Sequence, residues 1–127
     1  MGAYLYEKIT KTIIGAAFDV HNSLGKGLTE KAYENALALR LRQLGLHVEQ
    51  QKYLSLFFQN RKIGEQKVDL LVEERVIIEL KARAHLTREH VSQLLGYLKN
   101  TKYQLGLLLN FADKVEIKRL ILTNQHS

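Results

Sequence analysis

Three ionisable side chains interrupt two short apolar segments in the middle of the chain. Asp69 lies within residues 67–72, and Glu79 and Lys81 lie within residues 76–81. Removing even a neutral polar group from water without a partner costs about 2–7 kcal/mol, and a charge costs more. These three side chains therefore need partners. Two carboxylates beside a lysine suit a site that binds a divalent cation next to a phosphate group.

The turn between the two segments decides whether the carboxylates meet. Side chains alternate between the two faces of a strand, so the register of the pair fixes which residues share a face. A two-residue loop would set Asp69 opposite Ile78, facing away from Glu79. A loop of three residues, 73–75, sets Asp69 opposite Glu79 on the same face.

The hydrophobic pattern favours the three-residue loop. With that loop, one face of the strand pair is uninterrupted and apolar: Val68, Leu70, Val72, Val76, Ile78 and Leu80. The other face carries Lys67, Asp69, Leu71, Ile77, Glu79 and Lys81. A slip by one residue would scatter the apolar set over both faces, so we predict the three-residue loop.

Opposed residues in an antiparallel pair have Cβ atoms about 4.5–5.5 Å apart. Two carboxylates at that distance repel unless one is protonated or a cation lies between them. Oxygen ligands suit Mg²⁺ or Mn²⁺, and Lys81 would then lie where it can hold a phosphate or orient a water molecule. The alternative is a solvent-facing strand pair in which Lys81 bridges both acids, which contributes well under 1 kcal/mol.

The elements that position these residues follow from periodicity. Apolar residues at helical spacing predict a first helix over residues 4–23 and a second that Thr29 caps and Gly45 ends. The order is helix, helix, three strands, helix, strand, strand, with strands over 46–58, 67–72, 76–81, 104–111 and 115–122 and the third helix over 86–101. We expect a mixed α/β fold, a mixed central sheet flanked by helices, in which the third helix crosses between the third and fourth strands and the last strand is an edge.

Length and composition limit the class of protein. The 127 residues predict a single domain over residues 1–127, and a formal charge of +6 suits a polyanionic partner. Cysteine is absent, which excludes disulfides and zinc–thiolate sites. We expect no membrane span, because no apolar run approaches about 20 residues, and we expect a cytoplasmic setting.

An ordered set of motifs resembles a known family. An acidic residue followed about ten positions later by Glu-x-Lys resembles the PD-(D/E)XK nuclease superfamily. Gly27, Glu30 and Tyr33 have the spacing that names the GxxExxY family, a branch of that superfamily. Residues 21–25, 93–97 and 106–111 follow in the family's order. Val68 stands where the superfamily name has proline.

The resemblance implies a restriction-endonuclease-like core and a role for each matching residue. It implies Asp69 and Glu79 as metal ligands, with Glu30 as an acid reaching in from the second helix, and Lys81 as the catalytic lysine. It also implies Gln93 as a polar site residue on the third helix. From spacing alone, Glu30 begins an inward-facing stripe, and Gln93 with Tyr97 forms a local pair at i and i+4.

Three functions follow from these expectations. The first is a Mg²⁺- or Mn²⁺-dependent nuclease that hydrolyses phosphodiester bonds, with DNA as the expected substrate. The second is an inactive nuclease-fold module that binds nucleic acid or a protein partner without cutting. The third is a structural homodimer, since cleavage of both strands by small single sites requires symmetry.

Overall fold

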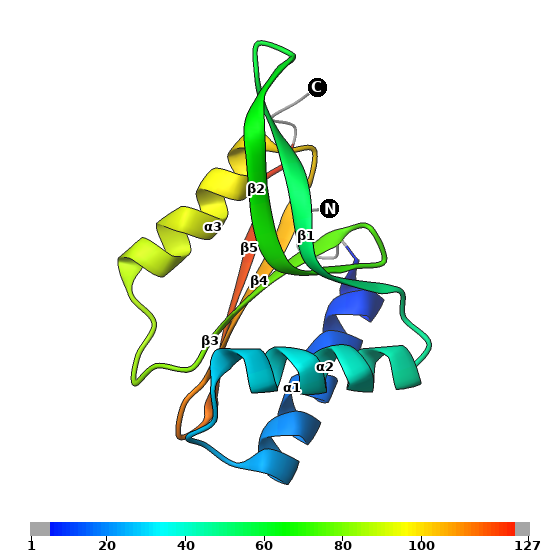
Figure 1. The fold of residues 1–127 in the computed structure, drawn as a ribbon, viewed down its shortest axis with the longest axis vertical. Coiled ribbons are helices and arrows are strands. Elements are labelled where there is room, and N and C mark those ends of the chain that lie inside the picture. The colour runs from blue at the N-terminus through cyan, green and yellow to red at the C-terminus, as the bar shows by residue number, and fades with distance from the viewer. Residues whose placement is uncertain (1–5, 124–127) are drawn as a thin grey trace.

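The computed structural model describes residues 6–123. Within them the elements follow the predicted order (Figure 1): α1 Glu7–Leu24, α2 Glu30–Gln43, β1 Val48–Phe58, β2 Arg61–Val72, β3 Val76–Lys81, α3 Arg88–Asn100, β4 Leu105–Phe111 and β5 Val115–Ile121. None of the described helices combines the length and the apolar character that crossing a bilayer requires. The mixed α/β fold expected from periodicity is confirmed.

Local signals set the limits of α2. The side chain of Thr29 accepts a hydrogen bond from the backbone N–H of Ala32 at 3.1 Å, which satisfies one of the free donors at the start of the helix. The helix ends at Gln43, and Gly45 follows with a φ of 88°. Glycine adopts that left-handed conformation without steric cost, so the predicted cap and stop are both confirmed.

The five strands form one mixed sheet in the order β1-β2-β3-β4-β5. All neighbouring strands are antiparallel except β3 and β4, which run parallel from Val76↔Leu105 to Lys81↔Asn110. Parallel neighbours need a crossover, and α3 supplies it, as the sequence predicts. The prediction that the last strand lies at an edge is also correct, because β5 pairs only with β4.

Apolar side chains fill a layer on each face of the sheet. Helices α1 and α2 cover one face, where Ile13, Tyr33 and Leu37 pack against the strands. Helix α3 covers the other face through Leu94 and Leu98. The close approach of α3 favours glycine in β4, because a Cβ on Gly106 would lie 3.0 Å from a side-chain carbon of Leu94 and would force Leu94 to shift. The central part of the sheet is thus buried between two helical layers, whereas the far end of the β1–β2 hairpin is not (Figure 1).

One part of the predicted apolar face is wrong. Leu70, Val72, Val76, Ile78 and Leu80 pack with α1 and α2 as expected, but Val68 packs with Leu71 and Ile77 in the α3 layer. The reason is a local break in alternation. Strand β2 separates from β3 at residue 69, and Gln51 in β1 has a φ of 51°. From this point to the end of the β1–β2 hairpin, side chains that alternation would direct toward α1 and α2 face α3, as Leu54 and Val68 do.

Candidate active site

The candidate site lies at a fork in the sheet, where β2 and β3 separate. Strand β2 pairs with β1 over nearly its whole length, but it pairs with β3 only over residues 70–72. The pair Val72↔Val76 leaves residues 73–75 in the turn, which confirms the predicted three-residue loop. Glu73 and Glu74 adopt φ angles of 55° and 54° in this turn. The same register brings Asp69 and Glu79 to the first position beyond the last paired residues.

The two carboxylates bind the backbone of the opposite strand at the fork. Glu79 Oε2 accepts a hydrogen bond from the backbone N–H of Asp69 at 2.7 Å. Asp69 Oδ2 accepts one from the backbone N–H of Leu80 at 2.8 Å. Side-chain oxygens therefore take the place of backbone carbonyls as the strands part, and these bonds hold the two acids close together.

Burial and mutual repulsion disfavour the charged form of both acids. Glu79 is only 9% exposed. Its burial, followed by the charge of Asp69, raises the pKa of Glu79 to about 8. Burial also raises the pKa of Asp69, although the hydrogen bond from the Leu80 N–H acts in the opposite direction. Without a cation, this pair therefore retains a proton near neutral pH.

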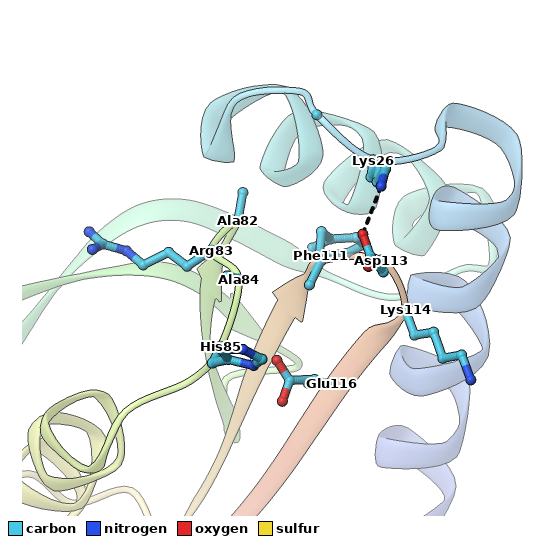
Figure 2. Close-up of a pocket in the computed structure, with 11 residues that line it drawn as sticks. Lys26, Ala82, Arg83, Ala84, His85, Phe111, Asp113, Lys114 and Glu116 are labelled. Carbon is cyan, nitrogen blue, oxygen red and sulfur yellow. Dashed lines mark hydrogen bonds and ion pairs between the residues drawn. The ribbon is translucent and has the colours of Figure 1, made fainter.

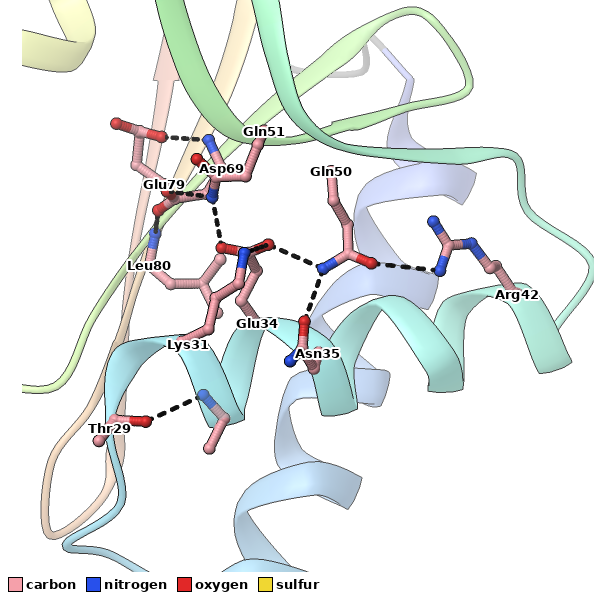
Figure 3. A network of polar contacts seen from close by, with 11 residues as sticks. Thr29, Lys31, Glu34, Asn35, Arg42, Gln50, Gln51, Asp69, Glu79 and Leu80 are labelled. Carbon is pink, nitrogen blue, oxygen red and sulfur yellow. Dashed lines mark hydrogen bonds and ion pairs between the residues drawn. The ribbon is translucent and has the colours of Figure 1, made fainter.

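A second layer connects the acids to α2 (Figure 3). Gln51 Nε2 donates to Glu34 Oε1 at 2.6 Å and lies 3.3 Å from Asp69 Oδ1. Glu34 is only 3% exposed, and its other oxygen accepts hydrogen bonds from Lys31 Nζ at 3.1 Å and from Gln50 Nε2 at 2.8 Å. Gln51 therefore orients Asp69 and joins it to a buried, fully engaged acid.

Sequence reasoning did not identify Glu34 or Gln51. The signal for Glu34 was its place beside Tyr33 in the buried stripe of α2, which consists of Tyr33, Glu34, Leu37, Ala38 and Leu41. The signal for Gln51 was the break in alternation of β1 around residues 50–52. Neither signal alone indicates a contact with Asp69, because the contact depends on how α2 docks against the fork.

Lys81 and Tyr97 approach the acid pair from β3 and α3. Lys81 is half-buried, and its charge lowers the pKa of both Asp69 and Glu79, in opposition to burial. Burial, followed by the negative charges of Glu79 and Asp69, raises the pKa of Tyr97 to about 12. Gln93 is exposed on α3 and hydrogen-bonds Tyr97, so the predicted local pair is confirmed.

Glu30 does not turn toward the carboxylate pair. Its side chain is 43% exposed, and its Oε2 lies 3.9 Å from Arg83 Nε. Glu30 is the first residue of α2, one turn before Glu34, and its side chain is half-exposed and not directed inward as expected. Its role as a metal ligand stays a prediction. Glu34 is the acid that α2 presents to the fork.

A separate hollow lies at the carboxyl ends of β3 and β4 (Figure 2). It has a volume of about 510 Å³ and is lined by residues 26–27, 82–85, 111–114 and 116. An ion pair between Lys26 Nζ and Asp113 Oδ1, 2.9 Å apart, crosses its rim. The GxxExxY spacing contributes here: Gly27 lines the hollow, and Tyr33 stacks on Phe111 with ring centroids 4.6 Å apart. None of the paired acids at the fork lines it.

The donors at the fork fit a hard divalent cation. Among residues 6–123, no three histidine, aspartate or glutamate side chains gather as a metal cluster, so the protein would supply two carboxylates. Mg²⁺ is commonly held by one or two carboxylates, with water and substrate phosphate as its remaining ligands. Such an ion compensates the repulsion between the buried Glu79 and the half-buried Asp69.

Comparison with known proteins identifies the family of this chain. The fold is that of a mixed α/β protein with an acid pair at a sheet fork, followed by a lysine. A family model described as the PD-(D/E)XK nuclease superfamily matches residues 7–120, and the chain belongs to that superfamily. No curated protein and no solved structure matches the chain significantly.

Proposed function

We propose that this protein is a metal-dependent nuclease of the GxxExxY branch that hydrolyses phosphodiester bonds of DNA. The observation that supports the proposal best is the pair of carboxylates at the fork, one buried and one half-buried, with Lys81 two residues beyond Glu79 on the same strand. Superfamily membership supports a nucleic acid as the substrate class. The formal charge of +6 favours association with a polyanion.

Each residue of the fork has a distinct part in this proposal. Asp69 and Glu79 would hold Mg²⁺ or Mn²⁺, and the ion would supply activation of water and neutralisation of charge on the phosphate. Lys81 places a fixed positive charge beside the phosphate oxygens, where negative charge develops. Gln51 and Glu34 are positioning residues that fix the orientation of Asp69.

The reaction requires no further reactant. The oxygen of a water molecule forms a bond to phosphorus, one ester P–O bond breaks, and the proton of the water is passed to the leaving oxygen. Glu30 and Gln93, which contact Arg83 and Tyr97, are left outside the metal shell in this proposal.

The test is cleavage of single- and double-stranded DNA and RNA with Mg²⁺, with Mn²⁺ or with a chelator. Wild type is compared with Asp69→Asn and Lys81→Ala, and Asp113→Asn serves as the matched control because it removes an exposed carboxylate of the hollow. We expect cleavage of DNA that requires metal and that only the two fork variants abolish. Cleavage that persists in Asp69→Asn, or no cleavage of any substrate, contradicts the proposal.

A nucleic-acid-binding module without cleavage is the second candidate. The observation that favours it is that only two metal-ligating side chains of the described residues meet at the fork. Such a module would bind DNA equally well in chelator and after Lys81→Ala. Loss of cleavage in that variant with unchanged DNA affinity separates an enzyme from a module.

A further inference from the structure

The β1–β2 hairpin extends well past its contacts with the rest of the sheet. Residues 53–58 of β1 and 61–67 of β2 form what we call the distal ribbon. They pair only with each other, because β3 meets β2 at residues 70–72 alone. Figure 1 shows the ribbon projecting beyond α3 and the remaining strands. Leu54 anchors its base in the apolar layer beneath α3.

The distal ribbon exposes apolar and cationic side chains together. Tyr53, Phe58 and Ile63 are 59%, 61% and 63% exposed. The ribbon carries three cations, Arg61, Lys62 and Lys67, against the single acid Glu65. Lys67 Nζ lies 5.9 Å from the centre of the Tyr53 ring. Lys67 itself is two residues from Asp69 along β2. The cations of the ribbon therefore begin two residues from Asp69 along β2 and extend to the tip of the hairpin.

The tip of the ribbon presents side chains suited to reading bases. Gln59 and Asn60 form a two-residue turn with φ angles of 50° and 63°, as the twist of a hairpin favours. Arg61 and Lys62 follow, and all four residues are exposed. Glutamine and asparagine pair with the major-groove edge of adenine, and arginine and lysine with that of guanine.

We propose that the distal ribbon enters the major groove of the DNA duplex that the fork cleaves. The inference rests on the proposed nucleic-acid substrate and extends it to a duplex-binding element. Two strands about 4.8 Å apart, with their side chains, fit a groove about 12 Å wide. The major groove of duplex RNA is too deep and narrow to admit them, so the ribbon selects DNA.

The geometry also places the contact along the duplex. Arg61 is eight residues from Asp69 on β2, which at about 3.3 Å per residue corresponds to roughly 26 Å. At about 3.4 Å per base pair, this length limits the contact of the tip to within roughly eight base pairs of the scissile bond. A duplex that extends about eight base pairs beyond the scissile bond is therefore long enough to engage the tip.

The test is equilibrium binding in chelator, where no cleavage occurs, with duplexes of increasing length. The variant is Arg61→Ala/Lys62→Ala, and the matched control is Lys8→Ala/Lys118→Ala, which removes two exposed lysines on α1 and β5. For a duplex of about 20 base pairs, the tip variant should bind about tenfold more weakly, and the salt dependence of log Kobs should fall by about 2. The difference should shrink as the duplex is shortened below about eight base pairs, because fewer binding positions then engage the fork and the tip together.

Three outcomes would overturn the inference. The first is equal affinity of the tip variant and the control for the long duplex. The second is binding of single-stranded DNA or duplex RNA as tight as that of duplex DNA. The third is a wild-type dimer that Phe58→Ser/Ile63→Ser converts to a monomer in sedimentation, which would make the ribbon a self-association surface.

Failure of this inference is distinguishable from failure of the proposed nuclease function. Duplex binding that depends on the tip, without any cleavage, supports the role of the ribbon and contradicts the proposed nuclease activity. If the tip variant cleaves and binds long duplexes as well as wild type does, the nuclease activity is supported and the role of the ribbon is contradicted. Circular dichroism and thermal unfolding of each variant establish that the exposed substitutions leave the fold intact.

Discussion

Acidic side chains lie both at the fork and in the hollow at the ends of β3 and β4, but their environments are opposite. In the hollow, Lys26 and Asp113 are 70% and 84% exposed, and their hydrogen bond raises the pKa of the lysine and lowers that of the acid. At the fork, burial raises the pKa of Glu79 to about 8. Charge is therefore favoured in the hollow and disfavoured at the fork. The Lys26–Asp113 pair of the hollow compensates its own charges, whereas the acid pair of the fork gains from a bound cation, so volume alone does not locate chemistry.

The largest expected difference between the two regions is in catalysis. Asp69→Asn and Lys81→Ala should each lower the rate of DNA cleavage by about 10²–10³-fold or more, because each removes a group that stabilises charge at the phosphate. Asp113→Asn and Lys26→Ala should leave the rate within about twofold, as expected for an exposed pair. Single-turnover cleavage under saturating metal measures the rates of the fork variants and of the hollow variants. A comparable loss in the hollow variants would remove the distinction between the regions.

A smaller effect is expected from the second layer of the fork. Gln51→Ala and Glu34→Gln should weaken metal affinity about 10- to 100-fold, because the partner of a ligand fixes its orientation. The concentration of Mn²⁺ that gives half-maximal cleavage measures this, and the maximal rate should fall less. Gln50→Ala is the matched control, since Gln50 contacts Glu34 but not Asp69. Equal effects of both glutamine variants would contradict a specific role for Gln51.

The fork should also dominate the dependence of stability on pH. The pKa of Glu79 is about 8 in the folded chain, above its ordinary value of 4.5, so the folded state binds a proton that the unfolded state has released. Stability in chelator therefore decreases as pH rises from about 5 to about 8. Glu79→Gln should flatten this decrease in the midpoint of thermal unfolding. A steep decrease that survives Glu79→Gln would contradict the assignment.

The smallest effect is expected at the rim of the hollow. Lys26→Ala removes an ion pair between two largely exposed side chains, which solvent and salt already screen. The midpoint of thermal unfolding should therefore stay within the error of the measurement at physiological salt. A clear decrease would show that the hollow depends on this pair more than its exposure suggests.

The fork was largely predictable from sequence because its information is local. The alternation of apolar residues over 67–81 gives the loop length, and the loop length places Asp69 against Glu79. Thr29 and Gly45 likewise give the ends of α2, since caps and stops depend on neighbouring backbone.

The parts that sequence did not predict depend on packing between distant elements. Glu30 and Glu34 lie one turn apart on the same helix, and only the docking of α2 decides which of them meets the sheet. The move of Val68 to the α3 layer follows from the separation of β2 and β3, and no pattern within either strand reports it. Long-range geometry decided both cases.

The central claim is that Asp69 and Glu79 together hold one divalent cation. Calorimetric titration of Mn²⁺ into the protein near pH 7, without nucleic acid, tests it most directly. We predict one site per chain, release of a proton as the ion replaces the one retained by the pair, and loss of binding in Asp69→Asn. Absence of Mn²⁺ binding in wild type, or equal binding and proton release in Asp69→Asn, would contradict the claim.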